Sequence, residues 1–77
     1  MMSILELVKK TVAKVTHSNE TDIKAETLLK DIKADSLDWV QIMVGIENAL
    51  DIEIDTDKMK EMASIGDLVK YLDGFKK

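Results

Sequence analysis

Hydrophobic residues at helical spacing predict a first helix over residues 3–16. Ser3 and Glu6 have the spacing of a capping box, in which each side chain accepts a hydrogen bond from a backbone N–H near the helix start. The apolar stripe that we expect to face a core consists of Ile4, Leu5, Val8, Val12 and Val15. Residues 17–35 follow without a sustained period, and we expect this long connection to be held against the core by Leu28, Leu29 and Ile32.

A second helix is predicted to begin at Asp35 or Ser36 and to end near Leu50. Asp35 is a favourable N-cap residue, and Asp38 places a carboxylate in the first turn. Spacing around the helix axis predicts a wide buried arc, which comprises Leu37, Trp39, Val40, Met43, Val44, Ile46 and Leu50. The opposite face is poor in charge, so we interpret it as either a contact surface or an ordinary exposed face. It comprises Asp38, Gln41, Ile42, Gly45, Asn48 and Ala49.

A loop and a short helix are predicted after the second helix. Acidic and apolar residues alternate over residues 51–55, but the chain offers no second strand to pair with them. We therefore expect a loop with Ile54 buried. A short helix over residues 56–62 should turn Met59 and Met62 inward.

The last helix should begin at Ser64 and end at Gly74, with an inward stripe of Ile65, Leu68, Val69 and Leu72. These elements predict an all-α fold, a small four-helix bundle with three longer helices and one short helix, in one domain over residues 1–77. The chain is 45% hydrophobic and 34% charged, which is typical of a globular protein. We expect a cytoplasmic monomer, because no apolar run approaches the roughly 20 residues that cross a bilayer and the N-terminus lacks a signal-peptide pattern.

Negative charge is concentrated in the centre of the chain. The net charge is −4, yet residues 31–57 contain eight acidic residues and one basic residue, Lys33, so this segment carries −7 and the remainder +3. An acidic centre argues against nucleic acid and anionic membranes as partners, because their phosphates would repel it. It favours a partner with a basic docking surface, although a solvated face is the plainer explanation of charge alone.

Few residues could support catalysis or hold a metal. The absence of cysteine excludes disulfides, zinc–thiolate sites and a thiol nucleophile, and His17 is the single histidine. The acidic run 51–57 imitates the start of a calcium loop, but Thr56 and Met62 stand where an EF-hand requires glycine and glutamate. We therefore expect no metal site, and a chain that is not an enzyme by itself.

One tetrapeptide, Asp35-Ser36-Leu37-Asp38, stands out as candidate chemistry. Its plainer interpretation is the start of a helix. Ser36 would nevertheless lie in the first turn, where free backbone N–H groups and the helix dipole favour an attached phosphate. The long connection before it should leave the hydroxyl exposed.

At these residues the chain resembles the acyl carrier protein family. The stretch from Leu28 to Asp38, centred on Asp-Ser-Leu, is similar to the family's approach to its attachment site. The resemblance covers nearly the whole chain, since it continues through Val40, Glu47, Asp51-Ile52-Glu53-Ile54 and the closing Tyr71-Leu72-Asp73-Gly74.

The resemblance implies a specific modification and a specific role. In this family the serine matching Ser36 receives 4′-phosphopantetheine from coenzyme A, and the arm ends in a thiol that holds acyl groups as thioesters. The implied partners are a phosphopantetheinyl transferase and acyl-transferring, condensing or acyl-loading enzymes with basic docking patches. The second helix is the family's main recognition element, and the acyl chain can enter the apolar space between the helices.

Two sets of candidate site residues follow. A surface for partner enzymes comprises Asp35, Leu37, Asp38, Gln41, Ile42, Gly45, Glu47 and Asn48. A pocket for the acyl chain comprises Leu28, Trp39, Met43, Ile46, Ile54, Met59 and Met62. Flexible methionines would let such a pocket adapt to cargo, although each of these side chains also suits an ordinary core.

Several positions depart from the usual family pattern. Lys33 stands where glycine is usual, Trp39 replaces a smaller residue, and Gln41 and Asn48 stand where carboxylates are common. We therefore predict a specialised carrier with fewer partners than a carrier of general fatty acid synthesis. An aminoacyl, peptidyl or polyketide carrier is an alternative, as is an unmodified helical adaptor with the same fold. A hydrolase using Ser36 is disfavoured, because no base is expected nearby.

Overall fold

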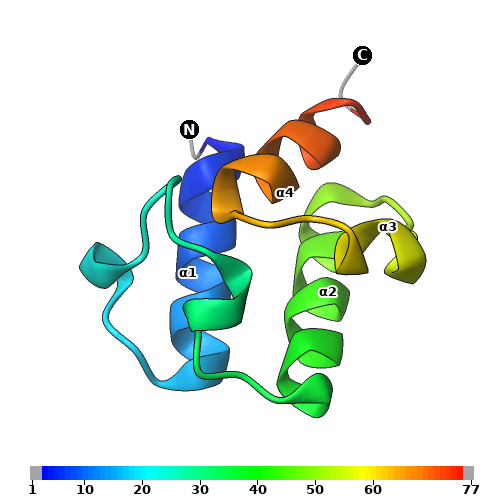
Figure 1. Cartoon of the computed structure of the whole chain (residues 1–77). Coiled ribbons are helices and arrows are strands. Elements are labelled where there is room, and N and C mark those ends of the chain that lie inside the picture. Colours follow the sequence, from blue (N-terminus) through cyan, green and yellow to red (C-terminus); the bar gives the residue numbers. More distant parts are fainter. Residues whose placement is uncertain (1–2, 76–77) are drawn as a thin grey trace.

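A computed structural model describes residues 3–75 and shows four α-helices joined by loops and short 3-10 turns (Figure 1). The α-helices are α1 (Ile4–Thr16), α2 (Ser36–Leu50), α3 (Thr56–Lys60) and α4 (Ile65–Asp73). The 3-10 turns are η1 (Glu20–Asp22) and η2 (Leu29–Asp31), and both lie in the connection between α1 and α2. The described residues contain no strand, only an isolated bridge, so the predicted all-α bundle of three longer helices and one short helix is confirmed.

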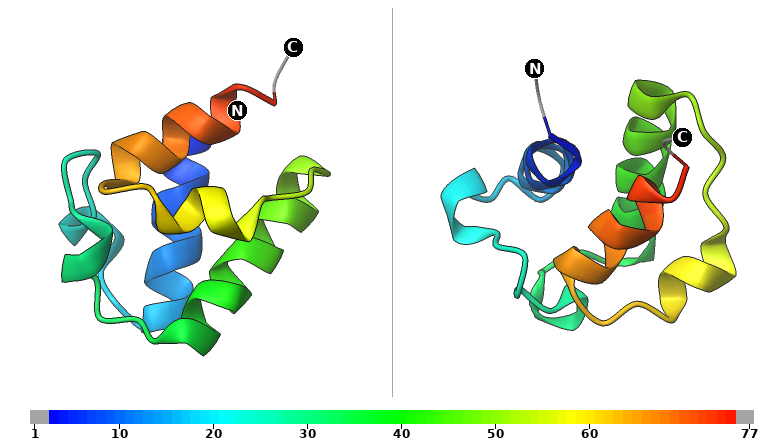
Figure 2. Two further views of the ribbon diagram at one scale, coloured as in Figure 1. Left: turned by 45° about the vertical axis from the view of Figure 1, so that its right-hand side comes forward. Right: turned by 90° about the horizontal axis from the view of Figure 1, so that it is seen from above.

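The helix α1 packs against both α2 and α4. Figure 1 shows α1 and α2 side by side and running in opposite directions, with α4 crossing near the ends where the chain starts and finishes. The start of α2 lies at the opposite end of the molecule, and the view from above in Figure 2 shows α3 away from α1 (Figures 1 and 2).

Capping boxes start the three longer helices. In α1, Ser3 and Glu6 form the predicted box, in which the Glu6 N–H donates to the Ser3 hydroxyl over 3.1 Å. Equivalent boxes open α2 and α4, formed by Asp35 with Asp38 and by Ser64 with Asp67. Each box satisfies backbone N–H groups that a helix start leaves unpaired, so the beginnings of these helices are fixed by local sequence.

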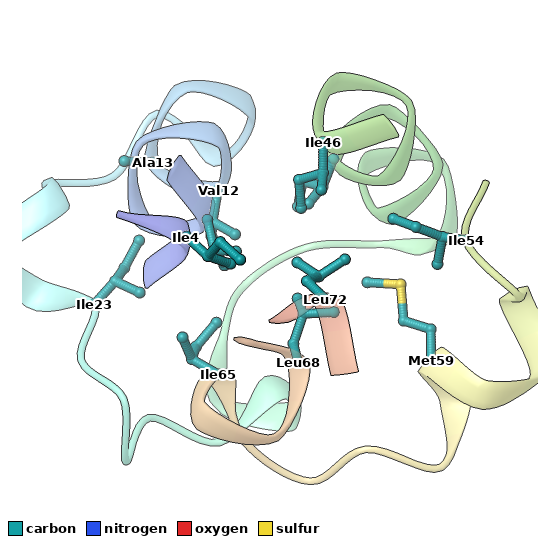
Figure 3. Packing of buried hydrophobic residues seen from close by; sticks show 12 residues of the cluster. Ile4, Val12, Ala13, Ile23, Ile46, Ile54, Met59, Ile65, Leu68 and Leu72 are labelled. Carbon is teal, nitrogen blue, oxygen red and sulfur yellow. The ribbon is translucent and has the colours of Figure 1, made fainter. Parts of the chain in front are cut away.

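Apolar side chains from all four α-helices and from two connecting segments meet in one core (Figure 3). The buried residues are Ile4, Val8, Val12, Ala13, Ile23, Ile42, Ile46, Ile54, Met59, Ile65, Leu68 and Leu72. The predicted burial of Ile54 and Met59 is confirmed, whereas Ile23, in the connection, is a core residue that the sequence pattern did not indicate. Among the residues that the structure describes, no charged or polar residue is buried in the core, so its stability rests on apolar burial and packing.

The long connection is fixed by backbone hydrogen bonds to the start of α4. The N–H of Leu29 donates to the carbonyl of Ala63 over 2.9 Å, and the N–H of Gly66 donates to the carbonyl of Ala25 over 2.7 Å. A Cβ atom at Gly66 would lie only 3.1 Å from that Ala25 oxygen, so the close approach of the two segments favours glycine. Of the three side chains expected to hold the connection against the core, Leu29 and Ile32 do so, whereas Leu28 is not among the residues packed against it.

The buried face of α2 differs from the predicted arc. Leu37, Val40 and Val44 were expected inside but are 66%, 51% and 46% exposed. Ile42 was expected outside but is completely buried. The prediction is therefore wrong for this half of the helix surface, although Trp39, Met43, Ile46 and Leu50 do contact or form the core.

The contact between α1 and α2 explains the difference. Gly45 faces α1, and a Cβ atom built on it would lie 3.1 Å from the Cγ2 atom of Thr11. The glycine thus lets the two helices approach closely on the side of α2 that carries Ile42. The apolar arc of α2 is wider than one helix contact can cover, so the half that contains Leu37 and Val44 remains in solvent.

Smaller differences concern the helix ends. The short helix α3 ends at Lys60, two residues earlier than predicted. The last helix ends before Gly74 as expected, but Gly74 keeps a right-handed conformation with φ −65°. Within the described part of the chain, the non-glycine residues with positive φ are His17 and Asp51, at the C-caps of α1 and α2. Lys33, which stands where the family usually has glycine, does not have a positive φ.

A double-mutant cycle tests the close contact of Gly45 with Thr11. In the natural background, Gly45→Ala should fail to give the stabilisation of about 1 kcal/mol expected for alanine over glycine in a helix, because its methyl group crowds Thr11. In a Thr11→Ser background, which lacks Cγ2, the same change should recover that gain. Urea unfolding of the four proteins measures the coupling. Equal effects of Gly45→Ala in both backgrounds would contradict the contact.

Candidate functional site

The hydroxyl of Ser36 is presented at the start of α2. Ser36 is the first residue of the helix, directly after the N-cap Asp35, and its side chain is exposed as predicted. The capping box occupies Asp35 and Asp38, whose carboxylate oxygens bond each other's backbone N–H groups over 2.9 and 3.4 Å. The Ser36 hydroxyl makes no hydrogen bond within the described part of the chain, which leaves it available as an attachment point.

The first turn of α2 also leaves backbone donors beside this hydroxyl. The N–H of Asp38 donates to Asp35 Oδ1, and the N–H of Trp39 donates to the Asp35 carbonyl. The N–H groups of Ser36 and Leu37 have no such acceptor among the described residues. Together with the positive end of the helix dipole, they favour a phosphate group bonded to the Ser36 oxygen.

A cleft of about 560 Å³ opens next to Ser36. Three parts of the chain form it, namely η2, the first two turns of α2, and α3 with the residues that follow it. We call it the Ser36 cleft, and its lining residues are Leu29, Lys30, Ser36, Trp39, Val40, Met43, Thr56, Met59 and Met62. Ser36 is thus a wall residue of an otherwise largely apolar space, which suits a tethered group with an apolar end.

Four of the predicted pocket residues line the Ser36 cleft, namely Trp39, Met43, Met59 and Met62. Three others do not. Ile46 and Ile54 are buried in the core, 0% and 5% exposed, and half-buried Leu28 pairs through its backbone with Ser64 instead. Their apolar character indicated burial, but it could not distinguish the core from the wall of an open cleft.

The cleft also contains residues that sequence reasoning did not assign to it, which are Leu29, Lys30, Val40 and Thr56. Leu29 was expected only to anchor the connection, and Val40 only to face the core. Lys30 and Thr56 gave no signal, because a charged residue and a helix-start threonine are common at surfaces. Their place in the wall follows from how η2 and α3 approach α2, which is a tertiary property.

The predicted partner surface is divided by the observed packing. Asp35, Leu37, Gln41 and Asn48 are exposed, whereas Asp38 and Glu47 are half-buried. Ile42 and Gly45 were expected on this surface, and that expectation is wrong because they face the interior and α1. The large exposed apolar residues of α2 are instead Leu37, Val40 and Val44, which we call the exposed α2 stripe.

Acidic residues of this region hold the loop that leads to α3. The N–H of Ile54 donates to Glu47 Oε2 over 2.7 Å, which ties the loop to the last part of α2. The N–H of Asp55 donates to the Tyr71 hydroxyl of α4 over 3.1 Å, and the Asp55 carboxylate caps α3. Glu47, predicted as a partner contact, therefore has a structural role that fixes one wall of the Ser36 cleft.

Two further searches of the described residues concern metals and membranes. Residues 3–75 contain no group of three or more histidine, cysteine, aspartate or glutamate side chains arranged to hold a metal ion. In the same part of the chain, no helix combines the length and apolar character needed to span a bilayer.

Comparison with known proteins identifies the family. A family model described as a phosphopantetheine attachment site matches residues 6–72. The acyl carrier protein of Wolinella succinogenes is 32% identical over 94% of this chain and 96% of its own length. Those of Campylobacter fetus subsp. fetus and Lactococcus lactis subsp. cremoris are 32% and 33% identical, over 99% and 97% of this chain and the whole of each relative.

The chain is therefore a phosphopantetheine-bearing carrier, and it belongs to the acyl carrier protein family. Members of this family carry acyl groups between enzymes and are not enzymes themselves. The cofactor is 4′-phosphopantetheine. The residues at the start of α2 fit this group, because an exposed hydroxyl, two free backbone N–H groups and an adjacent apolar cleft are in one place.

The bond between Glu47 and Ile54 can be tested by two substitutions at one position. Glu47→Ala should lower the free energy of unfolding by about 1–3 kcal/mol, because the part-buried Ile54 N–H loses its acceptor. Glu47→Gln keeps a carbonyl oxygen at the same place and should retain most of the stability. Urea unfolding measures both, and equal losses would show that the hydrogen bond does not hold the loop.

Proposed function

We propose that this chain works in the cytoplasm as a carrier of acyl intermediates, held as thioesters on a phosphopantetheine arm attached to Ser36. One observation carries the proposal: an exposed, unbonded serine hydroxyl forms part of the wall of an apolar cleft. The attachment family of the chain supports the same assignment. Because the chain contains no cysteine, the reactive thiol would come from the arm alone.

Residues around Ser36 have distinct tasks in this proposal. The capping box of Asp35 and Asp38 holds the first turn in shape, so the hydroxyl and the free N–H groups keep their places. The N–H groups of Ser36 and Leu37 stabilise the phosphodiester. The apolar wall of the Ser36 cleft, with Trp39 and the methionines, shelters part of the acyl group from water at about 0.8 kcal/mol per buried methylene.

The exposed α2 stripe is the proposed docking surface for partner enzymes. Leu37, Val40 and Val44 follow the spacing of one helix face and begin directly beside Ser36. Contiguous exposed apolar side chains of this kind are typical of interaction surfaces. Exposed carboxylates at Asp31, Asp51, Glu53 and Asp57 complement basic patches of a transferase or of acyl-transferring, condensing and acyl-loading enzymes.

We further propose that the carrier is specialised, with fewer partners than a carrier of general fatty acid synthesis. Two uncharged polar residues, Gln41 and Asn48, are exposed on α2 beside the stripe. A surface of this kind attracts basic partners less than a row of carboxylates would. General synthase enzymes should therefore load and elongate this carrier more slowly than their usual carrier, and equal rates would contradict specialisation.

The attachment site is tested by modification of the purified chain. Incubation with coenzyme A and a broad-specificity phosphopantetheinyl transferase should add the mass of one arm, and Ser36→Ala should abolish the gain. Because the Ser36 side chain is exposed and makes no hydrogen bond among the described residues, the circular dichroism spectrum of the variant should match that of the natural protein. An unchanged mass with several transferases would instead support an unmodified adaptor.

Docking through the exposed α2 stripe predicts an effect on KM. Val44→Thr keeps the shape of the side chain but places a hydroxyl on the docking surface. It should weaken docking by about 1 kcal/mol and raise the KM of a transferase about fivefold, with kcat unchanged. Lys10→Gln, on the exposed side of α1, is the control and should leave KM unchanged. An unchanged KM for Val44→Thr would place docking elsewhere.

A further inference from the structure

The Ser36 cleft has walls of different stiffness. Three of its residues are methionines. Met59 is buried in the core, whereas Met43 and Met62 are half-buried and have unbranched side chains that change rotamer at low cost. Trp39 is the largest residue of the wall and has a rigid ring system with two rotatable bonds. One part of the indole packs against the core while another lines the cleft, so it cannot move without disturbing both. The fixed boundary of the cleft is therefore Trp39.

The cleft is short along α2. Trp39, Met43 and Ile46 follow one another on a single stripe of the helix, but only the first two line the cleft. Ile46 is completely buried, and Figure 3 shows it pointing into the core with Leu72 and Met59. The helix wall thus extends from Ser36 to Met43, about 10 Å at 1.5 Å per residue. A longer acyl chain would have to enter a close-packed core, which costs stability.

From these two features we infer that Trp39 is a specificity-determining residue, which restricts the Ser36 cleft to short acyl groups. The indole lines the cleft one turn along α2 from Ser36, so an acyl group that enters the cleft on the end of the arm would lie against it. A short group fills the room that the methionines leave, whereas the end of a long chain remains in water. This inference rests on the proposed attachment at Ser36 and deepens it by naming the class of cargo.

Carriers loaded with acyl groups of increasing length test the inference. The natural chain, Trp39→Ala and Trp39→Leu are loaded from acetyl-, butyryl-, hexanoyl-, octanoyl- and decanoyl-coenzyme A by a broad-specificity transferase, and intact mass confirms each product. The melting temperature of the natural carrier should rise by a few degrees for each sheltered methylene of the acyl group. It should stop rising once the acyl group exceeds a short length. In both variants it should continue to rise with longer chains. Trp39→Leu keeps apolar contact with the core, so it provides the same test if Trp39→Ala does not fold.

Two controls separate the possible outcomes. Leu5→Ala removes an apolar side chain of α1 that packs against the core outside the cleft, so the chain length at which the melting temperature levels off should not change. Trp39 is the single tryptophan, so its emission in the natural carrier should shift when a short acyl group is loaded. Correct mass together with the same levelling length in natural and Trp39 variants would overturn the inference alone. No mass gain in any protein would instead overturn the proposed attachment.

Discussion

The close contact between α1 and α2 at Gly45 decides how the rest of the molecule is arranged. Because Gly45 has no side chain, α2 can lie against Thr11 with Ile42 and Ile46 turned into the core. The same rotation leaves Leu37, Val40 and Val44 in solvent and places Ser36 and Trp39 at an open cleft. A residue with a longer side chain at this position would have to turn or displace α2, and the exposed α2 stripe and the Ser36 cleft would change together.

The sequence predicted the parts of this structure that depend on neighbours along the chain. Capping pairs such as Asp35 with Asp38 fixed the helix starts, and apolar periodicity identified α1 and α4 with their buried faces. It could not predict which half of the apolar arc of α2 is buried, because that depends on a contact with Thr11, far away in sequence. The wall of the cleft also depends on how η2 and α3 approach α2, which the sequence pattern does not contain. Four pocket residues were therefore predicted, whereas Lys30 and Thr56 were missed.

The acidic centre of the chain has two roles that composition alone does not separate. Asp35, Asp38, Glu47 and Asp55 accept hydrogen bonds from backbone N–H groups and so hold helix starts and the loop before α3. Carboxylates that accept such hydrogen bonds stabilise local structure whether or not a partner enzyme is bound. These carboxylates keep their charge while they accept hydrogen bonds, so the acidic centre contributes both to local structure and to the charge that a basic partner would meet.

The Ser36 cleft combines a fixed side and an adaptable side, and this division follows from how each is held. The α2 side belongs to a helix that packs tightly against α1, so Trp39 and Ser36 keep a constant relation to each other. The α3 side is a helix of five residues that Met59 anchors in the core, and the loop before it donates hydrogen bonds to Glu47 and Tyr71. Half-buried Met62, just after α3, has an unbranched side chain that can follow the shape of a bound group at little cost. A carrier must release its cargo as well as shelter it, and a soft wall opposite a rigid one permits both without unfolding the core.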